Sequence, residues 1–331
     1  MSNERMRSGF SLIELLVVIG IIGILSGVML TTFSGASESA QASRCLTNMR
    51  NLSTAVHSCA MIDGYFPVSG SYAYRSDNGA VEKIGWISWV HPGFETPFRQ
   101  DKRGHYPRQS PATTSWRPVL GYEQGDVSGQ QRCSYAITNG TLWAHSGKSF
   151  ASYVCPMHQK ACNKYKIVPM WSYVMNSYFG CPNASFAIRG WVGRSFSGLV
   201  SSAGSSVPLG ADKVLLFAEV PFATIPKDKG AVQNTISKND LLTDSAACDC
   251  TLRYNDNSGV TVESIGFNHK SGKRYVAHVA FADGHVAQLA LPSGMGESQV
   301  KELTTWLCQG DEIAFDGRNY TRISQADQKS K

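Results

Sequence analysis

The chain has 331 residues, of which 42% are hydrophobic and 17% are charged, and its formal net charge is +6. This length allows a sizeable core in one large domain or two smaller ones, and the 10% of aromatic residues argues against intrinsic disorder. A small net charge spread along the sequence also argues against a dedicated nucleic-acid-binding protein.

The first predicted element is a hydrophobic helix over residues 10–30, which contain one charged residue, Glu14. A helix of this length spans about 30 Å, the thickness of the hydrocarbon core of a bilayer. Arg5 and Arg7 precede it, so the positive-inside rule keeps the N-terminus in the cytoplasm and sends the following residues across. Small residues at 31–43 leave a cleaved secretory signal open as an alternative.

Glu14 is the informative residue of this segment, because a carboxylate in the membrane costs about 2.5–3.5 kcal/mol and a plain anchor does not need one. The surrounding sequence, Arg7-Ser8-Gly9-Phe10-Ser11-Leu12-Ile13-Glu14-Leu15, closely resembles the class III signal of type IV pilins and type II secretion pseudopilins. In that family a prepilin peptidase cuts after the glycine and methylates the new N-terminal phenylalanine. The resemblance implies a leader peptide over residues 1–9, a cut between Gly9 and Phe10, and pairing of Glu14 with the Phe10 amine of a neighbouring subunit.

One position departs from the family pattern. Many pilins carry a proline at the twenty-second mature position, which is Thr31 in this sequence. The absence of that proline argues against a major, fibre-building pilin. Gly20, Gly23 and Gly27 supply either flexibility or close helix packing in its place.

The hydrophobic segment continues into an amphipathic helix that ends near Asp63-Gly64. Apolar residues recur with spacings of three and four at Ala42, Leu46, Met49, Leu52, Val56 and Cys59. We therefore expect one stem helix over residues 10–64. The stretches 45–52 and 63–67 also resemble a bacterial subfamily of prepilin-like proteins that has an H-X9-DG region near the C-terminus.

Residues 65–331 are predicted to form an exported globular head. Residues 68–130 are rich in Gly, Ser, Pro and aromatic residues and are interpreted as a variable insertion of loops and short strands. Residues 214–219 form an apolar run typical of a buried strand, and residues 275–291 predict a hairpin turning at Asp283-Gly284. The resemblance implies a pilin-like α+β fold, in which the long N-terminal helix packs on an antiparallel sheet.

The H-X9-DG motif of the subfamily corresponds to His269, Asp283 and Gly284. Thirteen residues separate His269 from Asp283 here, in place of nine, so the loop between them is longer.

Two sets of residues could bind a metal. Cys155, His158 and Cys162 have the spacing C-x2-H-x3-C, with Cys181 as a fourth zinc ligand. In an oxidising compartment a disulfide or simple packing is the alternative, and the pairing of the nine cysteines cannot be read from the sequence.

Glu219, His269 and Asp283 form the second set, whose oxygen-rich character suits Ca²⁺. The alternative is that Asp283 makes the turn, His269 caps a loop and Glu219 ends a strand at the surface.

The predicted function is structural, since the sequence contains no P-loop, nucleophile elbow, HExxH or paired-carboxylate motif. The resemblance implies a single-pass protein of the bacterial inner membrane, with a cytoplasmic N-terminus and a periplasmic or extracellular head. Its implied partners are the prepilin peptidase, other pilin or pseudopilin subunits and the inner-membrane assembly platform of a type II secretion or pilus-like filament. The alternative is a membrane-tethered domain that binds a ligand or glycan through an exposed groove lined by Trp86, Trp89 or Trp116.

Overall fold

The computed structural model describes residues 11–63, 66–67, 69, 73–75, 81–87, 120–176, 179, 210–222, 225, 251–252 and 264–323. Its elements in chain order are α1 (Leu12–Asp63), β1 (Ala73–Arg75), β2 (Val81–Ile84), β3 (Gly121–Glu123), α2 (Val127–Thr138), the 3-10 helix η2 (Phe150–Tyr153), α3 (Pro156–Asn163), β4 (Ile167–Pro169), β5 (Tyr173–Asn176), β6 (Leu215–Glu219), β7 (Thr251–Leu252), β8 (His269–Ser271), β9 (Arg274–Phe281), β10 (Val286–Ala290), α6 (Glu297–Gln309), β11 (Ile313–Phe315) and β12 (Tyr320–Arg322).

The stem is a single α-helix of 52 residues, α1, so the helix predicted over residues 10–64 is present. It begins with a capping box, in which Ser11 Oγ accepts a hydrogen bond from the Ile13 N–H at 3.4 Å. In return, Glu14 Oε2 accepts one from the Ser11 N–H at 2.8 Å. These two bonds satisfy backbone donors that the first turn of a helix leaves free.

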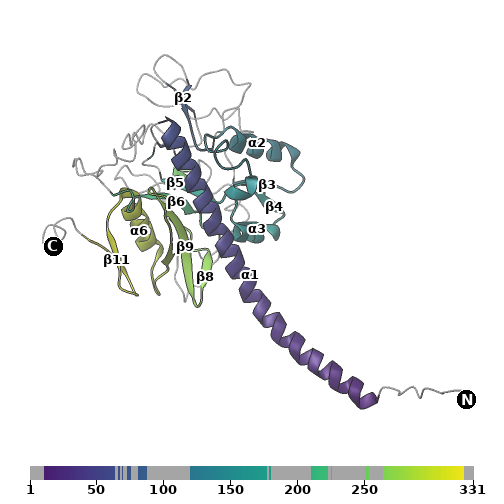
Figure 1. The fold of residues 1–331 in the computed structure, drawn as a ribbon. Helices are drawn as coiled ribbons and strands as arrows, with labels where there is room; N and C mark the ends of the chain where they lie inside the picture. The colour runs from purple at the N-terminus through teal and green to yellow at the C-terminus, as the bar shows by residue number, and fades with distance from the viewer. Residues whose placement is uncertain are drawn as a thin grey trace, which may run out of the picture.

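The two halves of α1 have different surroundings. The large apolar side chains from Leu12 to Leu25 are all exposed, between 46% and 76%. The second half buries one face, which comprises Cys45, Met49, Leu52, Ala55, Val56 and Cys59. Figure 1 shows the first half extending away from the head while the second half runs across it. Among the described residues, no helix combines the length and the apolar character needed to cross a membrane.

The main sheet has the strand order β10-β9-β6-β5-β7, and β8 also pairs with β9. Its pairings are antiparallel except for β5 with β7, which is parallel. The stem helix α1 contacts β6, β8, β9 and β10, and α6 contacts β6. The mixture of helices and an antiparallel sheet confirms the α+β class.

The hairpin predicted at residues 275–291 is formed by β9 and β10, with Val286 opposite Ala280. Gly284 lies in its turn with a φ of +92°, a conformation that favours glycine. The predicted buried strand at residues 214–219 is β6, and all five of its residues are buried. It is the middle strand of the order given above. Because successive side chains of a strand point to opposite faces, the burial of all five residues means that both faces of β6 are covered.

Trp86 is fully buried, so the expectation that it lines an exposed groove is wrong. Its ring stacks on Tyr153 with centroids 6.1 Å apart and meets the Phe217 ring edge-on at 5.1 Å. Such a large aromatic ring contributes more stability in the core than at the surface. Trp89 and Trp116, the other two residues of the expected groove, lie outside the described residues.

Candidate functional site

The processing region of the N-terminus is described from Ser11 onward, so Gly9 and Phe10 lie outside the described residues. Glu14 is exposed in the first turn of α1, and its Oε2 is engaged by the Ser11 N–H. The carboxylate therefore already caps its own helix, a role that favours a negative charge at this end of the helix dipole.

The surface around Glu14 is apolar, and none of the described residues covers it. A methyl group placed on Gly20, Gly23 or Gly27 would meet no atom within 4 Å. The described part of the chain therefore does not pack against these glycines, and a second helix could approach this surface closely.

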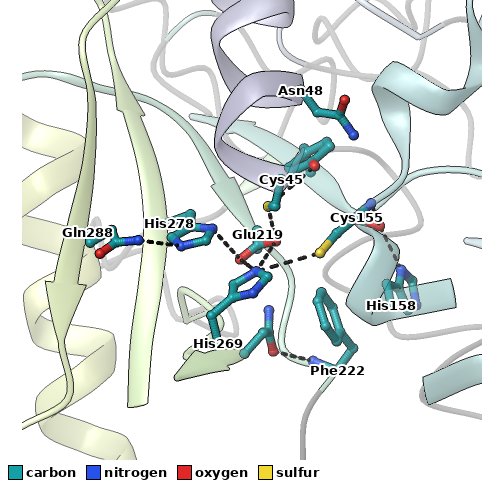
Figure 2. A network of polar contacts seen from close by, with 12 residues as sticks. Cys45, Asn48, Cys155, His158, Glu219, Phe222, His269, His278 and Gln288 are labelled. Carbon is teal, nitrogen blue, oxygen red and sulfur yellow. Dashed lines mark hydrogen bonds and ion pairs between the residues drawn. The ribbon is translucent and has the colours of Figure 1, made fainter. Parts of the chain in front are cut away.

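A cluster of metal-ligating side chains lies where the second half of α1 crosses the head (Figure 2). Cys45 comes from α1, Cys155 precedes α3, Glu219 ends β6 and His269 begins β8. One ligand atom from each residue lies within 4.8 Å of the other three, and all four side chains are buried. In the described part of the chain, this is the group of His, Cys, Asp and Glu residues that could hold a metal ion.

Local structure fixes each of these positions. Pro156 occupies the first turn of α3, which makes Cys155 the residue immediately before the helix. The Cys155 N–H donates to Ser172 Oγ at 2.8 Å, which ties this helix start to the segment leading into β5. Glu219 is held opposite Tyr173 in the β5–β6 ladder, and His269 is held opposite Val276 in the β8–β9 ladder.

The contacts within the cluster are short. The Cys45 thiol donates to Glu219 Oε1 at 2.6 Å, and the Tyr173 hydroxyl donates to Cys45 Sγ at 3.4 Å. His269 Nε2 lies 3.0 Å from each oxygen of the Glu219 carboxylate and 3.6 Å from Cys155 Sγ. Although His269 is this close, Glu219 Oε2 makes no contact with hydrogen-bond geometry among the described residues.

Burial and charge oppose each other at Glu219 and His269. Burial alone would raise the pKa of Glu219, but the adjacent His269 outweighs it and lowers this pKa to about 2. Burial alone would lower the pKa of His269, but the Glu219 charge and the Cys155 side chain raise it to about 10. Burial and then the contact with Cys155 raise the pKa of the Cys45 thiol well above its ordinary value. In this arrangement the carboxylate and the imidazolium form a buried ion pair.

A second histidine, His278 on β9, stacks on His269 with ring centroids 4.0 Å apart. Its Nε2 lies 3.1 Å from Gln288 Nε2, and its Nδ1 lies 3.9 Å from Glu219 Oε2. Burial lowers the pKa of His278 to about 4. If the Gln288 amide donates to Nε2, the ring carries its proton on Nδ1, the atom that faces Glu219.

The zinc set predicted from local spacing, Cys155, His158 and Cys162, is not assembled in the structure. His158 Nδ1 lies 2.9 Å from Ser172 Oγ, and its ring stacks on Phe222, so the helix directs it to a different partner. Cys162 is buried elsewhere on α3, and burial raises the pKa of its thiol to about 12. Cys181, the predicted fourth ligand, lies outside the described residues.

The calcium set predicted from Glu219, His269 and Asp283 is assembled only in part. Glu219 and His269 meet, but Asp283 lies in the β9–β10 turn, where its Oδ1 contacts His285 Nδ1 at 2.6 Å and accepts from the His285 N–H at 3.0 Å. Asp283 therefore makes the turn, as the alternative interpretation held. Glu219 ends strand β6 but is buried and not at the surface, and His269 is the buried first residue of strand β8.

Cys45 and His278 are the members of this region that sequence reasoning missed. Cys45 lies on the predicted stem helix, on the face that also buries Met49 and Leu52. The available signal was a cysteine on the buried face of the stem. The signal for His278 was a histidine within the alternating strand that leads to Asp283.

Two comparisons relate the N-terminal segment to known proteins. The family model described as "Prokaryotic N-terminal methylation motif" matches residues 5–30. Two sequences of the type IV major fimbrial protein FimA from Dichelobacter nodosus are each 34% identical to this chain over 61 residues. Those residues are 18% of this chain and 38% of each relative, so the match spans well under two thirds of the relatives' length. No solved structure matches the chain.

The matched motif contains Gly9, Phe10 and Glu14, and its presence confirms the resemblance to prepilins. The resemblance to the H-X9-DG subfamily stays a prediction. The chain thus carries a prepilin-type N-terminal methylation motif and, over 61 residues, is similar to a type IV fimbrial subunit.

Proposed function

We propose that the chain is a structural subunit, a pseudopilin or minor pilin, of a type II secretion or pilus-like filament. In this proposal a prepilin peptidase cuts between Gly9 and Phe10 and methylates Phe10. Residues 10–30 then hold the subunit in the inner membrane until the assembly platform adds it to the filament. The head stays on the periplasmic or extracellular side and performs no catalysis.

The exposed apolar half of α1 is the observation that carries this proposal. Each large side chain from Leu12 to Leu25 is at least 46% exposed within the single chain. Covering an aliphatic side chain of this kind stabilises by roughly 1.5–3 kcal/mol. Lipid tails cover this surface before assembly, and the stems of neighbouring subunits cover it in the filament.

Glu14 supports the same proposal because it combines two roles. Its Oε2 caps the helix by accepting from the Ser11 N–H, while the side chain remains exposed for a second partner. Removal of the leader creates an ammonium group at Phe10, next to Ser11. In a poorly screened environment the Phe10 ammonium of one subunit and the Glu14 carboxylate of its neighbour set the register between stems.

Two substitutions separate capping from charge pairing. Glu14→Gln keeps an acceptor for the Ser11 N–H and removes the charge, whereas Glu14→Ala removes both. Glu38→Gln, on the same helix beyond the apolar half, is the matched control. We expect all three variants to insert into the membrane, and the two Glu14 variants to enter sheared filaments at least tenfold less than the wild type and Glu38→Gln.

Mass spectrometry of the mature chain tests the processing step independently. The expected N-terminal residue is N-methylated Phe10. A chain that begins at Met1, or one cut near residue 36, would contradict processing by a prepilin peptidase. Normal filament entry of Glu14→Gln with correct processing would overturn only the pairing with the Phe10 amine.

A further inference from the structure

The buried cluster of Cys45, Cys155, Glu219 and His269 plays no part in the filament role proposed above. It draws its residues from four segments, namely α1, the start of α3, the end of β6 and the start of β8. All four side chains are buried, and Figure 2 shows them converging on one point beneath α1. Buried polar side chains need hydrogen-bond, ionic or metal partners, so a cluster of four in a core calls for an explanation.

The donor chemistry selects the partner. Two thiols, one imidazole and one carboxylate match the sulfur, nitrogen and oxygen ligands of Zn²⁺, which binds four of them as a tetrahedron. Ca²⁺ needs six to eight oxygen ligands, and this cluster offers a single carboxylate, so its composition does not fit calcium.

The separations bracket those of a zinc site, with the 2.6 Å between Cys45 Sγ and Glu219 Oε1 at the short end. Metal–ligand bonds of 2.0–2.3 Å place neighbouring ligand atoms of a tetrahedron roughly 3.3–3.8 Å apart. His269 Nε2 lies 3.6 Å from Cys155 Sγ and 3.0 Å from Glu219 Oε1, and no pair among the four ligand atoms is farther apart than 4.8 Å. An ion bound by all four would hold Cys45 Sγ and Glu219 Oε1 farther apart than their present 2.6 Å contact.

The surrounding groups act as outer partners of such a site. The Tyr173 hydroxyl donates to Cys45 Sγ, which stabilises a thiolate. Glu219 Oε2 and His278 Nδ1 are buried and lie 3.9 Å apart, and neither makes a hydrogen bond to another described residue, although Glu219 Oε2 forms an ion pair with His269 at 3.0 Å. If Glu219 binds the ion through Oε1, its second oxygen faces the His278 ring, which is the usual outer-shell arrangement for a ligating carboxylate.

We propose that Cys45, Cys155, Glu219 and His269 bind one structural Zn²⁺ that fastens the stem helix to the head. Four protein ligands close the coordination sphere, and the burial of the site leaves no open position for water or substrate, so the ion is structural. The zinc joins segments that are 174, 114 and 50 residues apart in the pairs Cys45–Glu219, Cys155–His269 and Glu219–His269. Its function is to order the head on α1 after export.

A disulfide between Cys45 and Cys155 is the competing chemistry in an oxidising compartment. In the structure both are free thiols that contact each other, and each also has a further partner: Cys45 contacts Glu219 and Tyr173, while Cys155 contacts His269. A disulfide would leave the buried Glu219–His269 pair without a role, whereas zinc uses all four side chains.

The test uses the full chain, purified in detergent from zinc-containing medium without reductant or chelator. Inductively coupled plasma mass spectrometry should give about one zinc per chain. Cys45→Ser and Cys155→Ser should each lower that ratio at least fivefold, and Cys162→Ser, which changes a buried thiol outside the cluster, should leave it unchanged. His269→Cys replaces one zinc ligand with another and should retain the metal, which keeps the test informative if a serine variant fails to fold.

Exchange of the wild-type chain with Co²⁺ provides a second measurement. Thiolate-to-cobalt charge-transfer absorption should appear in the wild type and the Cys162→Ser variant and disappear in Cys45→Ser. A Cys45–Cys155 disulfide in the peptide map of the wild type, or a zinc content that does not change in the double variant Cys45→Ser, Cys155→Ser, would overturn the proposal. Absence of stoichiometric zinc from the folded wild type would also overturn it.

Discussion

Gly284→Ala tests how the β9–β10 turn meets the stem helix. Gly284 has a φ of +92°, and a methyl group placed on it would lie 3.1 Å from Cε1 of His57 on α1. His57 Nε2 in turn contacts the Ala282 carbonyl oxygen at 3.0 Å. The substitution therefore strains the backbone of the turn and pushes against a side chain that links the stem to the sheet.

The expected loss of stability has two parts. An alanine at positive φ costs about 1–2 kcal/mol. Displacement of the His57 ring weakens its hydrogen bond to Ala282, which is worth about 0.5–1.5 kcal/mol. Gly272→Ala is the matched control, because Gly272 lies in the β8–β9 turn at a φ of +60° with no atom within 4 Å of the added methyl group. We expect a loss of about 2–3 kcal/mol for Gly284→Ala and about 1 kcal/mol for Gly272→Ala.

Urea unfolding of the full chain in detergent, followed by tryptophan fluorescence, measures both losses. A double-mutant cycle with His57→Ala then isolates the contact between the turn and the stem. Gly284→Ala should cost about 1 kcal/mol less in the His57→Ala background than in the wild type. Equal costs in the two backgrounds would show that the His57 contact does not limit residue 284, and the reasoning would fail.

Three further predictions concern the core and the surface. Leu52→Ala should destabilise the head by about 2–5 kcal/mol, because Leu52 is fully buried. Leu15→Ala is the control, since Leu15 is 58% exposed, and it should leave urea unfolding of the head unchanged. Burial lowers the pKa of His158 from 6.5 to about 4, so the folded chain keeps this side chain neutral. As the pH falls from about 6.5 towards 4, the unfolded chain binds the proton before the folded chain does, and stability is lost. His158→Phe should therefore flatten this part of the curve of stability against pH by up to roughly 3 kcal/mol, and an unchanged slope would contradict the assignment. Lys213→Ala should change stability by less than about 0.5 kcal/mol in the same urea assay, because the Lys213–Glu312 pair is more than one third exposed on both sides.

The elements that the sequence predicted are those whose cause is local. The spacing of three and four residues in the second half of α1 reflects one buried face of the helix. The dipeptide Asp283-Gly284 favours the tight turn that joins β9 to β10. Helix α6 has a similar period at Val300, Leu303 and Leu307, but its buried face also carries Thr304. Thr304 donates to the Val300 carbonyl and accepts from the Ile265 N–H, and a satisfied polar residue of this kind conceals the apolar pattern.

The buried cluster could be predicted only residue by residue. Cys155, Glu219 and His269 were each identified as candidates from their own neighbourhoods, but in two separate sets. Their meeting depends on strand pairings between distant segments, and Cys45 joins them only because α1 crosses the sheet at that point. Local spacing instead favoured His158 and Cys162, which α3 directs to other partners.

In the proposed filament, the continuity of α1 sets the orientation of each head relative to the N-terminal end of its stem. Glu14 and the buried residue Ala42 belong to the same uninterrupted helix. Each residue of an α-helix advances by about 1.5 Å and turns by about 100°. The number of residues between Glu14 and Ala42 therefore fixes the azimuth of the head relative to the paired N-termini. Insertion of a single residue there would leave both ends intact and present a different side of every head to its neighbours, whereas insertion of seven residues would restore the original facing to within about 20°.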